Sequence, residues 1–180
     1  ALRPQIDIDG RDQISQTPLS PTLTPREARI RILVIRHGAL GDVVQLLGAC
    51  QAIRAAHPQD EIIFLTMSPF APLARASGLF DAVWIDDRPR SLRGWAALAR
   101  RLRAARFDRV YDLQRKDRTN ILFQLLRVRT GARLEWSGAA WGCSHYAPFR
   151  GQERTHGTVK VADQLKLAGV GPVGRSDLSF

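Results

Sequence analysis

The sequence predicts an α/β fold: a Rossmann-like parallel sheet with helices on both faces. Segments with the composition of β-strands alternate with segments of helical periodicity, and the connections between them are short. The first strand-like segment, residues 30–35, is rich in β-branched residues, which is typical of a strand buried on both faces. We therefore expect at least five parallel strands, with residues 30–35 at the centre of the sheet.

Each element has its own signal in the sequence. The first helix carries an apolar stripe at helical spacing, formed by Val43, Leu46, Leu47, Cys50 and Ile53. A later helix is expected to end near Arg103 and Arg106, where arginine reaches its apolar face. In chain order, we expect strands over residues 30–35, 61–66, 82–85, 109–113 and 133–136, and helices over residues 41–56, 69–77, 91–105, 117–127 and 158–167.

The chain is expected to contain one domain between two segments without regular structure. Residues 1–28 mix prolines with Ser, Thr, Gln and Asp and show no periodicity, so we interpret them as a flexible leader. Residues 29–172 form the Rossmann-like domain. Residues 173–180 resemble the start of an interdomain linker, because residues 171–180 contain no element of their own.

The composition favours a soluble, cytoplasmic protein. With 44% hydrophobic and 24% charged residues, it has the balance of a globular domain. No apolar stretch approaches the roughly 18–20 residues of a membrane-spanning helix, and residues 1–28 lack the pattern of a signal peptide. Cys50 and Cys143 have no metal-ligand spacing, and Cys50 lies on the apolar stripe, so a reduced core thiol is the favoured interpretation.

Positive charge is concentrated in one part of the chain. The formal net charge is +10, and residues 88–118 contain eleven basic residues against three aspartates, a net charge of +8. Such a density favours a polyanionic partner: nucleic acid, an anionic lipid surface or a phosphorylated sugar. A compositional origin is the alternative, because arginine outnumbers lysine by 24 to 3, as happens in GC-rich genomes.

The turn after the first strand, residues 36–42, has the most informative sequence, Arg-His-Gly-Ala-Leu-Gly-Asp. Gly38 and Gly41 permit a tight turn and the close approach of a ligand, and the following helix N-terminus favours anions. The turn is neither a GxxxxGK[ST] phosphate loop nor a GxGxxG dinucleotide fingerprint. A dehydrogenase or methyltransferase of the Rossmann type is therefore disfavoured.

Asp42 has two interpretations at this point. It could cap the first helix, since Gln45 three residues later completes a capping-box pattern. It could also act as a general base at the mouth of the sheet, where a sugar transfer needs a carboxylate to take a proton from the acceptor hydroxyl. His37 in the same turn is either a second proton-handling group or a hydrogen-bonding residue.

Several segments resemble glycosyltransferase family 9, the ADP-heptose:lipopolysaccharide heptosyltransferases. The likeness covers about residues 29–180 and is most specific at the Gly-Asp turn of the first quoted segment. The segments are RILVIRHGALGDVVQLLGACQAIRAAHP, FDAVWIDDRPR, FDRVYDLQRKDRTNILFQLLRVRTGAR and RTHGTVKVADQLKLAGV. The chain departs from the family pattern at His37, Gly38 and Ala39, where Ser or Thr is common, and at Gly48, where many members have Pro.

The resemblance implies the N-terminal half of a B-type glycosyltransferase, the half that binds the acceptor. A second domain, absent from this chain, would bind the nucleotide sugar, ADP-heptose, so this chain alone is expected to be inactive. The reaction would be an inverting heptose transfer to a lipopolysaccharide inner-core acceptor, without metal or cofactor. The protein would be cytoplasmic, with peripheral contact at the inner face of the inner membrane.

The resemblance also implies roles for individual residues. Asp42 matches the catalytic base. The acceptor-binding residues would come from three turns and are Arg36, His37, Gly38, Gly41, Arg88, Arg90, Gln114, Arg118 and Thr119. The partners would be an anionic lipid-linked saccharide and a nucleotide sugar. The alternative function is a non-catalytic basic module that binds anionic polymers or a membrane surface; nucleic acid is disfavoured, because few aromatic residues interleave with the arginines.

Overall fold

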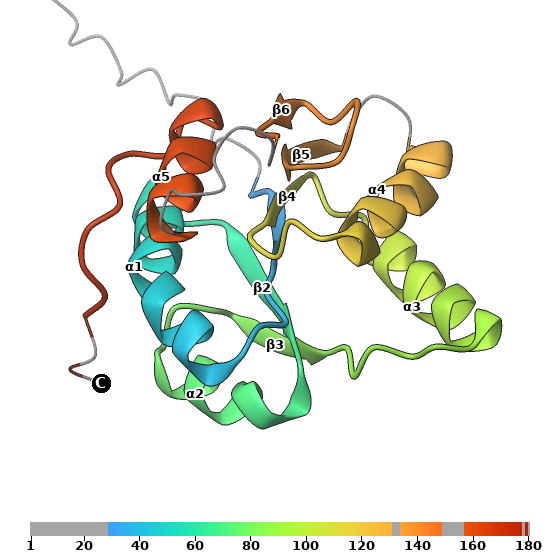
Figure 1. Ribbon diagram of the computed structural model, residues 1–180, viewed down its shortest axis with the longest axis horizontal. Helices are drawn as coiled ribbons and strands as arrows, with labels where there is room; N and C mark the ends of the chain where they lie inside the picture. The colour runs from blue at the N-terminus through green and yellow to red at the C-terminus, as the bar shows by residue number, and fades with distance from the viewer. Residues whose placement is uncertain (1–28, 131–133, 149–156, 178, 180) are drawn as a thin grey trace, which may run out of the picture.

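The protein contains a six-stranded, fully parallel sheet in the order β3-β2-β1-β4-β5-β6 (Figure 1). The computed structural model describes residues 29–130, 134–148, 157–177 and 179, so the expected leader lies outside the described residues. The strands are β1 (Arg31–Ile35), β2 (Glu61–Thr66), β3 (Ala82–Ile85), β4 (Arg109–Asp112), β5 (Glu135–Gly138) and β6 (His145–Tyr146). The parallel sheet with its first strand at the centre is confirmed.

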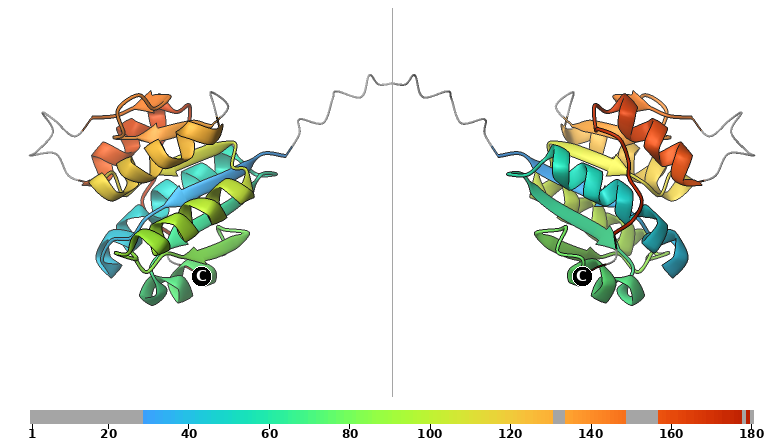
Figure 2. Two further views of the ribbon diagram at one scale, coloured as in Figure 1. Left: turned by 90° about the vertical axis from the view of Figure 1, so that its right-hand side faces the viewer. Right: turned by 90° about the vertical axis from the view of Figure 1, so that its left-hand side faces the viewer.

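Helices cover both faces of this sheet. They are α1 (Leu40–Ala56), the short 3-10 helix η1 (Ser68–Phe70), α2 (Ala71–Ala76), α3 (Leu92–Ala105), α4 (Asp117–Thr130) and α5 (Gly157–Leu167). α1, α2 and α5 pack on one face, and α3 and α4 pack on the other (Figures 1 and 2). The predicted Rossmann-like α/β class is therefore correct.

Strand β1 supplies side chains to both halves of the core. Ile32 and Val34 pack in the cluster under α1 and α5, whereas Leu33 and Ile35 pack in the cluster under α3 and α4. All four side chains are fully buried. Burial of such a side chain contributes roughly 1.5–3 kcal/mol. This two-sided burial explains why the strand shows no polar-apolar alternation.

The structure differs from the sequence prediction mainly in the last third of the sheet. β5 begins at Glu135 and continues to Gly138, later than predicted, and residue 133 lies outside the described residues. β6 was missed: it has only two residues, too few to show a periodicity, and it exists through parallel pairing with Ser137 and Gly138. Helix α4 also extends beyond the predicted end, to Thr130.

Both ends of α3 follow from local chemistry. Ser91 caps the helix, because its hydroxyl accepts a hydrogen bond of 3.1 Å from the Gly94 amide. Arg106 ends it in the left-handed conformation, with φ of 52°. The expected end near Arg103 and Arg106 is thereby confirmed.

Two sequence-based expectations on the core and the helices can be compared with the structure. Cys50 is buried and unpaired, as expected for a core thiol, and Cys143 is buried and unpaired as well. Across the described ranges, every helix is too short or too polar to cross a lipid bilayer.

Candidate functional site

The candidate site lies at the carboxyl edge of the sheet, where the turns after β1, β3 and β4 meet. Parallel strands end at the same edge, which is where ligands of open α/β sheets bind. Three contacts join the turns. The His37 amide donates to Gln114 Oε1 at 2.9 Å, Arg118 Nη2 donates to Asp86 Oδ1 at 2.9 Å, and His37 Nε2 lies 2.9 Å from Asp86 Oδ2. Residues from distant parts of the sequence thus form one assembly.

Asp42 is held at this edge by an ion pair with Arg36. The Nη2 atom of Arg36 lies 3.0 Å from Asp42 Oδ2, and its Nη1 atom donates to the Leu113 carbonyl at 2.7 Å. Arg36 is mostly buried, with 16% of its side chain exposed, whereas 51% of the Asp42 side chain is exposed. The arginine therefore orients a carboxylate that remains accessible from solvent.

The alternative interpretation of Asp42 as the helix cap is wrong. Helix α1 begins at Leu40, its N-cap residue is Ala39, and no side chain makes a capping hydrogen bond there. Asp42 lies within the first helical turn, where the helix dipole favours a negative charge. The capping-box pattern of Asp42 and Gln45 does not mark the start of the helix, because α1 begins two residues before Asp42.

The two glycines of the turn are in different environments. A Cβ atom on Gly38 would lie 2.7 Å from Asp42 Oδ2 and 2.9 Å from Arg36 Nε, so only glycine fits beside the ion pair. A Cβ atom on Gly41 would have no neighbour within 4 Å. The structure thus explains Gly38 by packing, while Gly41 leaves open space over the exposed start of α1.

Asp86 is the buried centre of the assembly, and the sequence analysis missed it. Its side chain is 1% exposed, and its carboxylate also accepts a hydrogen bond of 2.9 Å from the Arg88 amide. Burial alone would raise the pKa of Asp86, but the contacts with His37 and Arg118 outweigh burial and lower the pKa to about 2. Its position directly after a strand, with arginines following, was the available signal.

His37 and Arg118 are largely committed to Asp86. The His37 side chain is 3% exposed, and its contact with Asp86 lies outside hydrogen-bond angles. Arg118 forms a forked contact with both Asp86 oxygens, at 2.9 Å and 3.1 Å, and its guanidinium lies 4.2 Å from the centre of the Trp95 ring. The His37 ring is thus buried against Asp86 with little access to a ligand, and among the described residues only the His37 backbone amide makes a hydrogen bond within the site.

Arg88 and Arg90 are exposed beside this buried cluster. Together with Asp87 and Arg118 they line a surface hollow of about 330 Å³. Arg88 adopts the left-handed backbone conformation, with φ of 59°. The hydrogen bond from its backbone amide to the Asp86 carboxylate holds that conformation. The hollow therefore presents two arginine side chains to an anionic ligand.

Gln114 and Thr119 occupy the turn after β4 in different ways. Gln114 is half-buried and connects this turn to the His37 backbone. Thr119 is fully buried, and its hydroxyl donates to the Lys116 carbonyl and accepts from the Lys116 amide. In this conformation Thr119 stabilises the start of α4 and has no surface for an acceptor.

Asp112 is a second buried carboxylate that the sequence analysis did not single out. It is fully buried at the end of β4, and its Oδ1 atom accepts hydrogen bonds from the Gln114 and Arg115 amides. Its Oδ2 atom has no hydrogen-bond partner among the described residues. Burial raises the pKa of Asp112 to about 6, despite the opposing effect of these donors.

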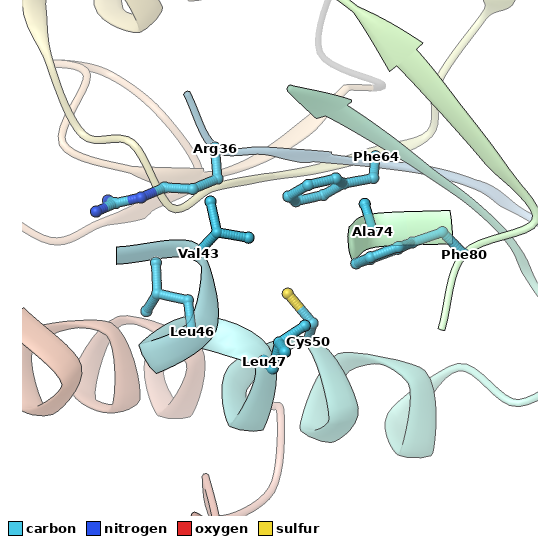
Figure 3. Close-up of a pocket in the computed structure, with 8 residues that line it drawn as sticks. All are labelled: Arg36, Val43, Leu46, Leu47, Cys50, Phe64, Ala74 and Phe80. Carbon is cyan, nitrogen blue, oxygen red and sulfur yellow. The ribbon is translucent and has the colours of Figure 1, made fainter. Parts of the chain in front are cut away.

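An apolar cavity behind the ion pair belongs to the core. Figure 3 shows it between α1, β2 and α2, with the Arg36 guanidinium directed away from Phe64 and Phe80. The cavity has no volume that a water molecule could enter. Burial raises the pKa of the Cys50 thiol at its wall to about 12, which makes this thiol unreactive.

Comparisons with known proteins identify the fold. No protein-family model and no curated protein sequence matches the chain. Among solved structures, it is similar to a glycosyl transferase family 9 protein from Veillonella parvula, with 20% identity and a TM-score of 0.66 over 82% of this chain. It is also similar to the E. coli heptosyltransferase WaaC with ADP-2-deoxy-2-fluoro heptose, with 18% identity and a TM-score of 0.57 over 83% of this chain.

The chain spans about half the length of these two structures, 44% and 52% respectively. At these identities the likeness shows the fold. The chain thus has the Rossmann-like fold of part of a family 9 glycosyltransferase, as the sequence resemblance implied.

Replacement of Gly38 by alanine tests whether the ion pair depends on this glycine. The new methyl group would overlap Asp42 Oδ2 and displace the ion pair, so we expect Gly38→Ala to destabilise the protein by about 1 kcal/mol in chemical denaturation. Gly41→Ala is the matched control, because it adds the same methyl group in open space and favours the helix. Equal stability of the two variants would contradict this account of Gly38.

The raised pKa of Asp112 predicts an unusual pH dependence of stability. Between pH 4 and 6 the folded protein binds the Asp112 proton more tightly than the unfolded chain, so this group makes stability fall as pH rises. The quantity to measure is the free energy of unfolding of the wild type minus that of Asp112→Asn. We expect this difference to fall across this window, with a slope approaching about 1.4 kcal/mol per pH unit. Asp86 acts oppositely and at lower pH, since its stabilisation is lost as pH falls through the range from 3.8 to about 2. A pH-independent difference would contradict the prediction.

Proposed function

We propose that this chain is the acceptor-side domain of an inverting glycosyltransferase that transfers heptose from ADP-heptose to a lipopolysaccharide inner-core acceptor. The observation that carries the proposal is the half-exposed Asp42 carboxylate, held by Arg36 at the ligand-binding edge of the sheet. The fold shared with a heptosyltransferase supports this choice of reaction. The donor is proposed to be bound mainly by a second domain, and the transfer to need no metal or cofactor.

In the proposed reaction, Asp42 acts as the general base. Its carboxylate takes the proton of the acceptor hydroxyl while the hydroxyl oxygen attacks the anomeric carbon of the heptose. The bond from that carbon to the phosphate oxygen breaks, ADP leaves with the electron pair, and the configuration inverts. Arg36 contacts Asp42 Oδ2, and about half of the Asp42 side chain is exposed, so the carboxylate can meet the acceptor hydroxyl.

The acceptor is proposed to bind across the three turns. Arg88 and Arg90 in the surface hollow would contact phosphate or carboxylate groups of a lipid-linked saccharide. The backbone at Gly41, where no side chain intervenes, allows the sugar to approach Asp42 closely. Arg36, His37, Gln114 and Arg118 would shape the floor of the site, since their side chains are engaged in contacts with one another and with Asp86 and Asp42.

A peripheral contact with the inner membrane is part of the proposal. Helix α3 contains no acidic residue and exposes Arg93, Arg100 and Arg101, and Leu92 at its start is 87% exposed. Exposed arginines beside an apolar side chain suit an anionic lipid surface, where the lipid-linked acceptor resides. The same helix supports the alternative of a non-catalytic basic module.

Nucleic acid fits this surface less well. Trp84 and Trp95 are partly buried against the core, and each ring has an arginine over it. Arg101 lies 4.0 Å from the centre of the Trp84 ring, and Arg118 lies over Trp95. Their faces are thus occupied and would not stack on bases.

Replacement of Asp42 by asparagine in the full-length protein tests the base. We expect turnover with ADP-heptose and a lipid-linked acceptor to fall by roughly 10²–10⁴-fold with little change in KM, because asparagine cannot take the proton. Thermal stability should change little, since an exposed ion pair contributes only about 0–1 kcal/mol. Asp163→Asn, which neutralises an exposed carboxylate on α5 away from the proposed acceptor site, is the control. Normal turnover in Asp42→Asn would exclude this base.

Removal of the two exposed arginines tests the acceptor site. We expect Arg88→Gln with Arg90→Gln to weaken acceptor binding roughly tenfold at low salt and to reduce its dependence on salt, because exposed charge contacts are screened. The control removes the exposed charges of Arg75 on α2 and Lys166 on α5, on the other face of the sheet. Titration calorimetry at about 50 and 300 mM salt is the measurement. Equal losses in both double variants would argue for general charge attraction instead.

A further inference from the structure

A segment near the end of the described chain, residues 173–177, is fastened along helix α1; we call it the strap. It follows α5 and crosses α1 on the outside of the molecule (Figure 2). Val173 packs at the edge of the core under α1 and α5. The other contacts of the strap with α1 are hydrogen bonds and one close backbone approach.

The Ser176 hydroxyl forms hydrogen bonds with two backbone groups of α1. It accepts a hydrogen bond of 3.1 Å from the Gly48 amide and donates one of 2.9 Å to the Val44 carbonyl. In an α-helix the amide of one residue bonds the carbonyl four residues earlier, so these are the two groups that an uninterrupted α1 joins directly. Ser176 thus bridges the two ends of one step of the helical ladder, within a helix that is continuous from Leu40 to Ala56.

The strap lies so close to α1 that it requires the glycine beneath it. A Cβ atom on Gly48 would lie 2.4 Å from the Gly174 carbonyl oxygen and 3.2 Å from the Ser176 nitrogen. These neighbours are backbone atoms, which cannot rotate away. Any larger residue at position 48 would therefore expel the strap from the helix.

A second contact fixes the register of the strap. The Gln51 side-chain amide donates to the Asp177 carbonyl at 3.0 Å and accepts from the Asp177 amide at 3.2 Å. Gln51 follows Gly48 by nearly one helical turn, so the strap is held at two successive levels of α1. Ser176 is thereby kept at the height of Val44 and Gly48.

The bridge lies directly after the turn that carries Asp42. Val44, whose carbonyl receives the Ser176 hydroxyl, is two residues beyond Asp42 in the same helical turn. In the first turn of α1, Leu40, Gly41 and Asp42 are exposed, and the turn is held by buried Val43 and by the Arg36–Asp42 ion pair. The bridge between Val44 and Gly48 adds a restraint directly after this turn.

We propose that Ser176 is a positioning residue, which sets the direction of the first turn of α1 and with it the place of the Asp42 carboxylate beside Arg36. The chain that leaves the domain at Asp177 is thus coupled to the candidate base through one hydroxyl group. The catalytic consequence rests on the function proposed above, whereas the structural coupling does not.

The structural coupling is tested by backbone NMR of this chain. We expect Ser176→Ala to shift the amide signals of residues 40–43, because loss of the hydroxyl removes its bonds to the Gly48 amide and the Val44 carbonyl and releases the first turn. Ser176→Thr keeps the hydroxyl and should leave these signals close to those of the wild type. Gly48→Ala, which expels the strap by another route, should reproduce the shifts of Ser176→Ala.

Ser179→Ala is the matched control, because it removes a serine hydroxyl that contacts the Asp177 side chain rather than the backbone of α1. Shifts confined to residues 44–51 and 173–177 in both Ser176→Ala and Gly48→Ala would overturn the proposal. So would a failure of Ser176→Thr to restore the signals of residues 40–43.

The catalytic consequence is tested in the full-length protein by a double-mutant cycle. We expect Ser176→Ala to lower kcat roughly three- to tenfold with unchanged KM, Ser176→Thr to restore it, and Ser176→Ala to have no further effect once Asp42 is asparagine. Equal effects with and without Asp42 would overturn a role through this residue. If the wild type transfers no heptose, the proposed function fails, while the NMR result still decides the coupling.

Discussion

The buried Asp86 carboxylate is the constraint on which the candidate site depends. Its charge is removed from water, so it is tolerated only because His37, Arg118 and the Arg88 amide surround it. These partners belong to the turns after β1 and β3 and to the start of α4, which the sheet brings to one edge. One carboxylate thus joins the turns after β1 and β3 to the start of α4, and Arg88 next to it has a left-handed backbone conformation.

Pairing with buried or partly buried aspartates divides the basic residues of the site into two groups. Arg36 and Arg118 are mostly buried and paired with aspartates, so their charge is largely neutralised within the protein. Arg88 and Arg90 are exposed and remain available to a ligand. The high charge of residues 88–118 is therefore not a uniform patch, and its total overstates what an acceptor would meet.

Much of the fold could be predicted from the sequence because the signals were local. The two-sided burial of β1 is visible in its own residues, and α1 and α3 have apolar stripes of helical period. β6 could not be predicted, since a two-residue strand exists only through its partner β5. The candidate site was predictable in outline, because three turns at one sheet edge must meet.

The details of the site that escaped prediction are those that depend on contacts between turns. Contacts with His37 and Arg118, which join separate turns, lower the pKa of Asp86, whereas burial raises the pKa of Asp112. Asp42 was open to a capping interpretation until Arg36 was seen to hold it within the first helical turn. Thr119 belongs to a motif that resembles an acceptor-facing turn, yet its hydroxyl is used by the Lys116 backbone.

The two departures from the family pattern have local physical reasons. At Gly38 a hydroxyl-bearing side chain, common in the family, would collide with the Arg36–Asp42 ion pair as it stands here. At Gly48 a proline, present in many members, would lack the amide that bonds Ser176 and would meet the Gly174 carbonyl. Both glycines therefore permit a backbone or ion pair to come closer than a side chain would allow. In this chain the geometry around Asp42 is set by close packing on one side and by the strap on the other, rather than by hydroxyl donors in the turn.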